Sequence, residues 1–257
     1  MAAFGEGRVL RNECVIDLRG VSKDFASGPS TVHALRPATM ALNRGEFVLL
    51  EGPSGSGKTT LLSIMGLLLQ PTAGQIEICG TRVTGLSEDK LPSFRLKHVG
   101  FIFQSYNLFP ALSAIENIKL ILKLKGYSWS ERRKEAPRLL ERVGLEDCMH
   151  RKPSDLSGGQ RQRVCIARAL AGDSDVILAD EPTAALDTKT GIEIIELLRD
   201  EARSGRKAVL VVTHDPRLEK YATRLDRISD GVHIPGAPMP RRTRTISERR
   251  PAYEFAH

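Results

Sequence analysis

Aromatic residues are scarce in this sequence, where phenylalanine, tryptophan and tyrosine make up 5% of the 257 residues. Proteins that hold nucleic acid by stacking its bases need aromatic side chains interleaved with basic ones. The net charge of +7 would otherwise favour such a partner, but the lysines and arginines are scattered along the chain. We therefore predict no nucleic-acid partner and expect the basic excess to lie on a solvated surface.

Two further absences concern the cellular compartment. No stretch approaches the roughly 18 apolar residues that a membrane span requires, and the opening MAAFGEGRVL lacks both the charged start and the apolar stretch of a secretory signal. The four cysteines, Cys14, Cys79, Cys148 and Cys165, form no CxxC pair and no metal-binding spacing. The sequence thus predicts a cytosolic chain with reduced thiols and no zinc site.

What the sequence does contain is a glycine-rich loop between an apolar strand, EFVLLE at 46–51, and a helix that begins in TTLLSIMGLLL. The loop satisfies the pattern GxxxxGK[ST], in which glycines let the backbone approach phosphates and amide N–H groups at the helix N-terminus bind the anion. We expect Lys58 to reach the β- and γ-phosphates and Thr59 to offer its hydroxyl to Mg²⁺. The predicted nucleotide-binding residues of the loop are Gly52, Pro53, Ser54, Gly55, Ser56, Gly57, Lys58, Thr59 and Thr60.

A second motif, VILADEP at 176–182, places two carboxylates directly after a run of apolar residues. Asp180 would stand at the C-terminal end of a strand, where open α/β sheets bind ligands, and its oxygens suit Mg²⁺. Glu181 is then the candidate general base that polarises the attacking water. An acidic pair after a strand can also start a helix or a turn, but the phosphate loop favours the catalytic interpretation.

A third motif, LSGGQ at 156–160, is followed by RQRVCIARALAG and then by VILADEP. This order and spacing resemble the ATP-binding subunit of ABC transporters, over residues 15–231. The resemblance implies that each signature segment grips the γ-phosphate of ATP bound to a second copy, through amides at a helix N-terminus. The residues that it implies beyond the phosphate loop and the acidic pair are Phe25 at the adenine, Gln104 at Mg²⁺, Ser157, Gly158, Gly159 and Gln160 at the γ-phosphate, Asp187, and the switch histidine His214.

Within the family, the segments at 100–118 and 177–191 resemble the lipoprotein-release, macrolide-export and heterocyst glycolipid-export group. The chain departs from the family at three positions. Phe25 stands where a tyrosine is usual, which keeps the ring that stacks on adenine. Ala184 replaces a serine or glycine near Asp187, and Glu51 places a negative charge beside the phosphate loop.

The chain divides into three parts. Residues 1–13 are an N-terminal extension, 14–233 form the ATPase domain, and 234–257 are rich in arginine and proline, which predicts a disordered basic tail. Alternating strands and helices predict an α/β fold, an ABC-type P-loop ATPase domain with a mostly parallel sheet. An antiparallel β portion at the N-terminus, with strands at 14–21 and around 46–51, and an inserted helical subdomain at about 105–172 complete it. We expect Ser130 to cap the helix in SWSERRKEAPRLLERVGL and Pro137 to kink it.

These patterns indicate an ATP-hydrolysing subunit that works as a homodimer with ATP and Mg²⁺. The resemblance implies a separate integral-membrane permease, a periplasmic adaptor as a further partner, and a peripheral position on the cytoplasmic face of the inner membrane. Large apolar side chains at Leu108, Phe109 and Leu112 predict that the segment 105–117 docks the permease. A cell-division or mechanotransmission ATPase remains the alternative. DNA-repair and translation ATPases of this family usually have a long coiled-coil insertion or two ATPase domains, and neither is present.

Overall fold

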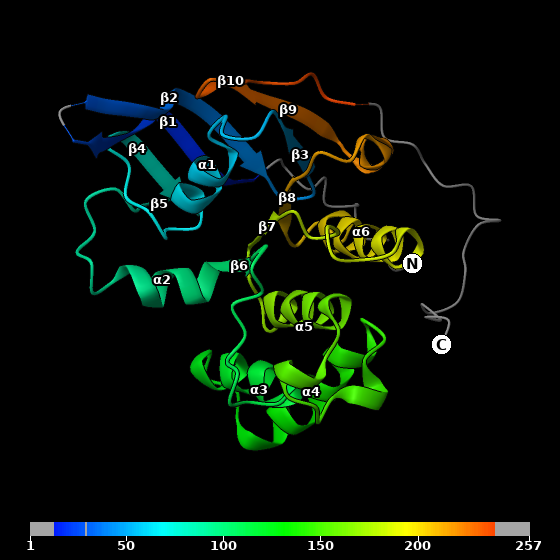
Figure 1. Ribbon diagram of the computed structural model, residues 1–257. Coiled ribbons are helices and arrows are strands. Elements are labelled where there is room, and N and C mark those ends of the chain that lie inside the picture. The colour runs from blue at the N-terminus through cyan, green and yellow to red at the C-terminus, as the bar shows by residue number, and fades with distance from the viewer. Residues whose placement is uncertain (1–12, 29, 240–257) are drawn as a thin grey trace, which may run out of the picture.

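The computed structural model describes residues 13–28 and 30–239. Two sheets and a group of helices make up the fold: the antiparallel sheet lies at the top, the mostly parallel sheet runs from β9 and β10 at the top to β6 and β7 in the middle, and the helical lobe lies below (Figure 1). The elements, in chain order, are β1 (Cys14–Ser27), β2 (Ser30–Asn43), β3 (Phe47–Glu51), α1 (Lys58–Met65), β4 (Ala73–Ile78), β5 (Thr81–Arg82), α2 (Leu91–His98), β6 (Val99–Ile102), α3 (Ala114–Leu124), α4 (Trp129–Glu141), η1 (Glu146–Cys148), η2 (Pro153–Asp155), α5 (Gly158–Leu170), β7 (Val176–Asp180), α6 (Thr188–Arg203), β8 (Ala208–Val212), η3 (Pro216–Tyr221), β9 (Arg224–Ser229) and β10 (Val232–Ile234).

The central sheet has the strand order β10-β9-β3-β8-β7-β6. Neighbouring strands from β9 to β6 run parallel, and β10 pairs with β9 in the antiparallel sense. All residues of β7 and β8 are buried, as expected for parallel strands that are covered on both faces. The predicted mostly parallel sheet is confirmed.

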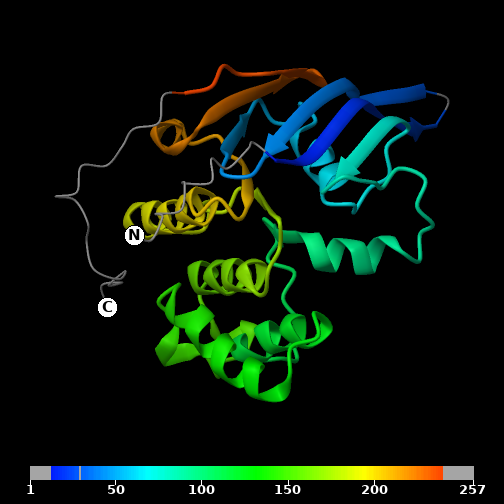
Figure 2. The same ribbon diagram turned by 180° about the vertical axis from the view of Figure 1, so that it is seen from behind.

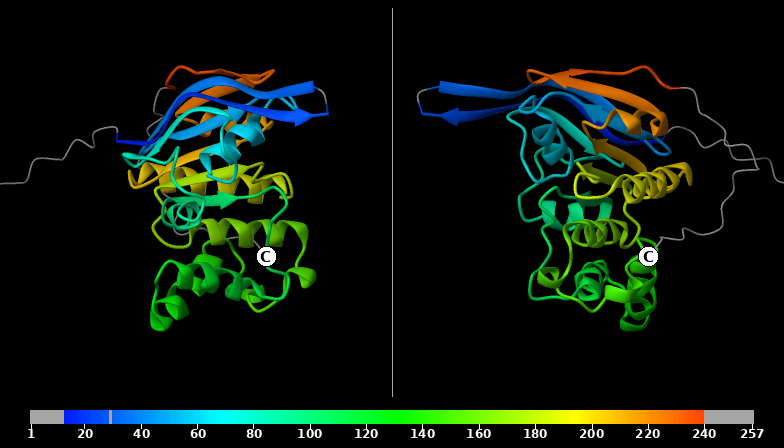
Figure 3. Two further views of the ribbon diagram at one scale, coloured as in Figure 1. Left: turned by 90° about the vertical axis from the view of Figure 1, so that its left-hand side faces the viewer. Right: turned by 45° about the vertical axis from the view of Figure 1, so that its right-hand side comes forward.

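The second sheet is antiparallel, with the order β2-β1-β4-β5. Its long β1–β2 ribbon extends beyond the body of the protein (Figure 3). The sequence predicts that the strand at 46–51 belongs to this N-terminal β portion. That assignment is wrong, because β3 pairs with β8 and β9 and so lies inside the parallel sheet.

Side chains from opposite faces of the parallel sheet enter two separate hydrophobic clusters. Val48 and Leu50 of β3 face α1 and the antiparallel sheet, whereas Phe47 and Leu49 face α5, α6 and the helical lobe. The rear view shows α2 and α6 on opposite sides of the parallel sheet, and they pack against different core clusters (Figure 2). This layering leaves the carboxyl-terminal edge of the parallel sheet for the loops that carry the motifs.

The helical lobe comprises α3, α4 and α5, within the range expected from the sequence. The expected cap at Ser130 is wrong by two residues: Ser128 caps α4, because its hydroxyl accepts from the Glu131 N–H while the Glu131 carboxylate accepts from the Ser128 N–H. Pro137 lies inside this helix, which continues to Glu141, and the expected kink stays a prediction. None of the helices in the described ranges has the length and hydropathy of a membrane span.

The predicted tail begins later than the composition suggested. Ile234 belongs to β10, the Gly236 N–H donates to Asp226 (3.0 Å), and the Met239 N–H donates to the Thr223 carbonyl (2.7 Å). Residues 234–239 therefore run alongside β9 rather than forming a tail. The rest of the predicted tail and most of the N-terminal extension lie outside the described residues.

Candidate functional site

Four motif segments meet at one edge of the parallel sheet. The glycine-rich loop follows β3, Thr213 and His214 follow β8, Asp180 ends β7, and Gln104 lies two residues beyond β6. These strands are consecutive neighbours in the order β3-β8-β7-β6 and run in the same direction. The carboxyl ends of the strands thus present the motifs side by side, which is where open α/β sheets bind ligands.

The backbone of the glycine-rich loop adopts conformations that side chains do not tolerate. Gly57 has φ 105°, and a Cβ there would lie 2.4 Å from the Ala34 carbonyl. A Cβ at Gly52 would lie 2.1 Å from the Ile228 carbonyl. The Ser56 hydroxyl is buried without a hydrogen-bond partner among the described residues. The loop is therefore packed tightly against β2 and β9, and it encloses the Ser56 hydroxyl.

Lys58 is the first residue of α1, and Gly57 caps the helix in the left-handed conformation. The Lys58 ammonium donates to the carbonyls of Gly52 and Pro53 (2.7 Å each) and so curls over the loop. A lysine charge, the amides of the first helical turn and the positive end of the helix dipole converge here. This donor set fits a polyphosphate.

Thr59 and Asp180 form the second part of the site. The Thr59 hydroxyl donates to Asp180 Oδ2 (3.3 Å), so an alcohol and a carboxylate lie next to each other. Burial raises the pKa of Asp180, and the nearby charge of Glu181 raises it further. A buried carboxylate of this kind is stabilised by a cation, and hard oxygen ligands suit Mg²⁺. The residues present therefore fit a bound magnesium ion.

Glu181 and His214 form a pair immediately beside this carboxylate. His214 Nδ1 lies 2.8 Å from Glu181 Oε1, and the hydrogen bond and charge of Glu181 raise the pKa of His214. Glu181 adopts φ 48°, a left-handed conformation that is costly for a residue with a side chain. Its N–H donates to the Val212 carbonyl (3.0 Å), which fixes the residue between β7 and β8. The hydrogen bond to His214 orients Glu181 Oε1, and Glu181 Oε2 stays available to accept a proton.

The signature residues lie at the start of α5 in the helical lobe. Ser157 and Gln160 form a capping box: the Ser157 hydroxyl accepts from the Gln160 N–H (3.2 Å), and the Gln160 side chain accepts from the Ser157 N–H (2.9 Å). A Cβ at Gly159 would approach the Ala185 carbonyl to 3.2 Å, and one at Gly158 would approach the Tyr106 hydroxyl to 3.3 Å. The signature is thus wedged between the loop after β6 and the loop after β7.

The loop after β6 is fixed by residues that the sequence analysis did not identify. Tyr106 and Asn107 both have left-handed φ angles, 64° and 50°. The guanidinium of Arg168, which is 9% exposed, donates to both of their carbonyls, and the Cys165 thiol donates to the Tyr106 carbonyl (2.9 Å). Both anchors lie on α5, so one helix carries the signature and holds the loop that contains Gln104.

Three other predicted positions have clear surroundings. Phe25 is exposed on β1, with the Lys23 ammonium 5.2 Å from its ring centre. Asp187 caps α6 by accepting from the Thr190 N–H (3.0 Å), and that bond lowers its pKa. Glu51 is half-buried, and its pKa is raised by burial and by Glu219, while Arg227 opposes the shift. The sequence offers no reason for this glutamate, and the structure places it beside η3 and β9.

The apolar residues of the segment 105–117 do not all face outward. Phe109 is 47% exposed, whereas Leu108 packs against the core of the helical lobe. The buried side chain of Asn117 shapes the segment by accepting from the Phe109 N–H (2.9 Å) and donating to the carbonyls of Phe109, Leu112 and Ser113. Phe109 is therefore the residue that this segment presents.

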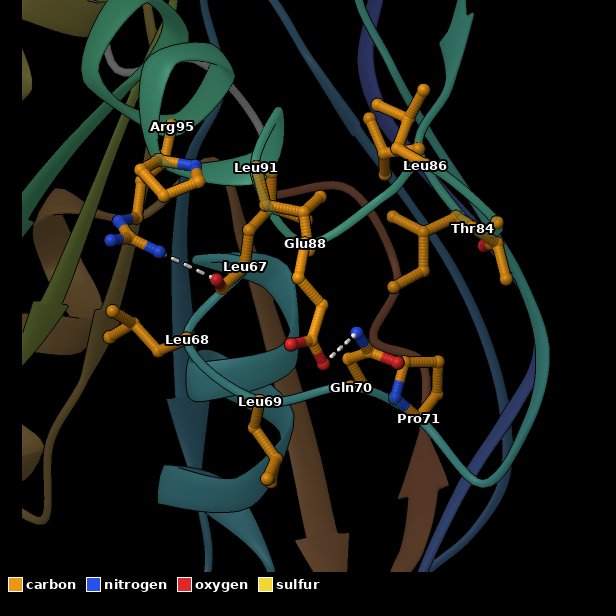
Figure 4. A pocket seen from close by; sticks show the side chains of 14 residues that line it. Leu67, Leu68, Leu69, Gln70, Pro71, Thr84, Leu86, Glu88, Leu91 and Arg95 are labelled. Atoms are coloured by element: carbon orange, nitrogen blue, oxygen red, sulfur yellow. Dashed lines mark hydrogen bonds between the residues drawn. The ribbon is translucent and has the colours of Figure 1, made fainter.

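A pocket of about 280 Å³ lies beyond the end of α1. Figure 4 shows Leu67, Leu68 and Leu69 on one side, with Leu91 next to Leu67, and Leu86 on the other side. Leu68 is 41% exposed. Two contacts close the pocket: Arg95 donates to the Leu67 carbonyl (2.8 Å), and Gln70 donates to Glu88 (3.3 Å). The lining combines these leucines with the polar side chains of Gln70, Thr84, Glu88 and Arg95.

Comparisons with known proteins agree with this geometry. Residues 35–184 match the family model described as ABC transporter. An uncharacterised ABC transporter ATP-binding protein of Thermotoga maritima is 48% identical over 84% of this chain and 92% of its own length. A macrolide export ATP-binding/permease protein, MacB, of Rhodopseudomonas palustris is 45% identical over 90% of this chain, which spans only 35% of that protein.

Solved structures give the same result. The chain superimposes on the ATP-binding cassette MJ0796 with a TM-score of 0.81 and 43% identity, covering 84% of this chain and 95% of that one. That structure is a dimer in a post-hydrolysis state bound to ADP and Pi. A second structure of the same cassette, also dimeric, matches equally well. This chain therefore belongs to the ABC transporter family, as an ATPase cassette.

Proposed function

We propose that the chain binds and hydrolyses ATP as a homodimer, in which each phosphate loop faces the signature segment of the other copy. The observation that carries the proposal is the row of functional groups at one sheet edge. Lys58 lies over the phosphate loop, the Thr59–Asp180 hydrogen bond is next to it, and the Glu181–His214 pair follows. No residue expected at the catalytic edge is missing from the sequence.

Each group has a role that its position supports. Lys58 and the loop amides would bind the phosphates. Thr59, Asp180 and Gln104 would hold Mg²⁺, which when bound neutralises charge on the phosphate oxygens. His214 occupies one oxygen of Glu181, so the other oxygen accepts a proton from the attacking water. The imidazole, made more basic by Glu181, donates its remaining N–H to the γ-phosphate.

The dimer follows from where the signature lies. Ser157 to Gln160 belong to the helical lobe, and the contacts described for them join them to the loops after β6 and β7 of their own chain. Their exposed helix N-terminus then serves a nucleotide on the partner. The dimeric ATP-binding cassette MJ0796, 43% identical to this chain, supports such an arrangement.

We further propose that the chain powers a membrane permease, as an exporter ATPase on the cytoplasmic face of the inner membrane. The MacB relatives are named as ATP-binding/permease proteins for macrolide export, and this chain spans about a third of their length. A separate permease chain would supply what the ATPase part lacks. A mechanotransmission or cell-division ATPase is the alternative, and a periplasmic adaptor is a further expected partner.

The permease would dock at Phe109 and at the pocket beyond α1. Phe109 and Leu68 of the pocket are exposed apolar side chains, and hydrogen bonds to Asn117 and Arg168 hold the loop with Phe109. Because Phe109 lies on the same loop as Gln104, a permease bound at Phe109 would be coupled to the nucleotide site. The occupant that fits is a short amphipathic helix with one large apolar side chain in the pocket.

Hydrolysis is tested by measuring phosphate release with Mg²⁺ and ATP for wild type and Glu181→Gln. The substitution removes the proton acceptor, so we expect turnover to fall by about 10²–10⁴-fold while ATP still binds. Gel filtration should then show an ATP-dependent dimer that accumulates in Glu181→Gln. Wild-type turnover in Glu181→Gln would remove this residue from the mechanism.

Docking is tested by co-purification with a candidate permease that is co-expressed with the chain. Phe109→Asp should abolish it and leave ATP hydrolysis in the isolated chain unchanged, because the Phe109 side chain is exposed and the loop is held through backbone groups that bond to Asn117 and Arg168. Trp129→Asp, on the exposed side of α4, is the matched control and should have no effect. Equal retention of the permease by Phe109→Asp would refute the docking surface without affecting the proposed hydrolysis.

A further inference from the structure

The structure brings together three metal-ligating side chains that lie far apart in the sequence. Cys79, His98 and Asp175 each offer one ligand atom, and these atoms all lie within 4.8 Å of one another. All three residues are partly buried rather than free on the surface. We call this group the Cys79 cluster. It is distinct from the ATP site, because His98 and Asp175 precede β6 and β7, at the opposite edge of the parallel sheet.

Each ligand is held by a different element. Cys79 sits in the turn between β4 and β5, where its φ of 49° and that of 74° at Gly80 form a tight hairpin. The Cys79 N–H donates to the Val15 carbonyl (2.9 Å). His98 is the last residue of α2, and its ring packs on Phe94 with centroids 4.4 Å apart. The thiol and the imidazole are therefore positioned by the backbone and by packing.

Asp175 makes the most hydrogen bonds of the three residues. The Asp175 N–H donates to the His98 carbonyl (2.9 Å), and the Asp175 carbonyl accepts from the Ala208 N–H (2.9 Å). Its Oδ1 accepts from Arg44, while Oδ2 lies 2.7 Å from His98 Nδ1. Arg44 thus fixes the orientation of the carboxylate, as outer partners do in metal sites, and leaves Oδ2 directed at the other ligands.

We propose that the Cys79 cluster binds a divalent transition-metal ion of the zinc type. A thiolate, an imidazole and a carboxylate are the ligands that zinc prefers, and a water completes the tetrahedron. Zinc lies about 2.0–2.3 Å from such atoms, so three ligand atoms within 4.8 Å of one another need only small side-chain movements. On binding, the Cys79 proton leaves to solvent, and the imidazole proton moves from Nδ1 to Nε2.

The consequence is structural. The three ligands belong to the antiparallel sheet, to α2 and to the start of β7, so a shared metal ion would tie the antiparallel sheet to the parallel one. Arg44 adds a positive charge beside the site, and only three side chains are ligands, so we expect weaker binding than at a four-ligand zinc centre. Because the nucleotide loops lie at the other edge, binding stabilises the fold and leaves basal ATP hydrolysis unchanged.

The experiment titrates the full chain, freed of any histidine tag, with Co²⁺. A thiolate ligand gives a charge-transfer band in the near ultraviolet, and tetrahedral geometry gives intense visible bands. We expect both bands at one equivalent in wild type. Cys79→Ser should lose the charge-transfer band, and Cys79→Ser and His98→Gln should each weaken binding at least tenfold. Cys14→Ser is the matched control, because Cys14 is exposed and outside the cluster, and it should behave as wild type.

Melting curves with Zn²⁺ give an independent readout. The melting temperature of wild type and Cys14→Ser should rise by several degrees and return on adding a chelator, while that of Cys79→Ser should not move. Unchanged ATPase rates would show that the variants are folded. Two results overturn the proposal: a wild-type chain without a thiolate band at a large excess of Co²⁺, which leaves the cluster as a hydrogen-bond network, or a band that persists in Cys79→Ser.

Discussion

Replacing Arg168 with leucine removes the anchor of the loop that carries Gln104. The Arg168 guanidinium is the donor for two carbonyls, those of Tyr106 and Asn107, at a place that is almost fully buried. Both of these residues have left-handed φ angles, so the loop is held in a conformation that it would not adopt unaided. The change therefore acts on stability and on the position of Gln104 together.

The expected loss of stability in Arg168→Leu follows from the two carbonyl acceptors that lose the guanidinium. The Asn107 carbonyl loses the guanidinium as donor, which costs about 1–3 kcal/mol. The Tyr106 carbonyl keeps the Cys165 thiol, so its loss is smaller, about 1 kcal/mol. Burial lowers the pKa of Arg168, which shows that its charge is costly to bury. Removing that charge offsets part of the lost stability. A net destabilisation of about 2 kcal/mol lowers the melting temperature of a domain of this size by roughly 4–8 °C.

Thermal unfolding followed by circular dichroism measures the first effect, and phosphate release measures the second. We expect turnover to fall more than ATP affinity, because the phosphate loop is untouched. Arg168→Lys should be intermediate, since an ammonium cannot reproduce both bonds of a planar guanidinium. Arg138→Leu is the control, because Arg138 is exposed on α4. Melting within a degree of wild type, with unchanged turnover, would refute the anchoring role of Arg168.

Two further predictions concern the catalytic edge. Gly57→Ala should abolish ATP binding, because its Cβ would meet the Ala34 carbonyl at 2.4 Å, whereas Gly55→Ala meets nothing within 4 Å and suffers only backbone strain; equal binding by both, measured by calorimetry, would contradict the packing of the loop. The pKa of His214 is raised by Glu181, so the imidazole is protonated below the usual value near 6.5 and loses its proton only as the pH rises above it. Glu181→Gln should therefore lower the His214 midpoint in an NMR titration, and an unmoved midpoint would show that the two side chains are not paired in solution.

Much of the site could be predicted because it is encoded locally. The phosphate loop, the acidic pair and His214 each follow an apolar strand within a few residues, and parallel strands bring such ends to one edge. The capping box of the signature is likewise a short-range pattern. The antiparallel and parallel sheets were expected in outline, but the membership of β3 depended on pairing with β8 and β9, which no local pattern reveals.

The rest depends on contacts between distant residues. Nothing in the sequence distinguishes Arg168 from the other arginines of its helix. Only the fold brings it to a loop about sixty residues away in the sequence. His98 and Asp175 are separated by 77 residues, so no spacing rule connects them with Cys79. The helix α2 is short and none of its side chains is fully buried, so its sequence carries no strong helical pattern. The pairing of residues 234–239 with the edge of β9 was hidden by a composition typical of tails.

The central claim is that each ATP is hydrolysed between the phosphate loop of one copy and the signature of the other. Lys58→Ala and Ser157→Arg should each be inactive alone, for different reasons: the first loses phosphate binding, and the second blocks the partner's nucleotide. Mixing the two variants tests the claim directly, because a mixed dimer pairs one damaged loop with one damaged signature and leaves the other composite site intact. Since half of randomly paired symmetric dimers are mixed, we predict that the mixture recovers roughly a quarter of the wild-type rate of phosphate release. No recovery in a mixture shown to contain mixed dimers would mean that each site is built within one chain, and would contradict the account.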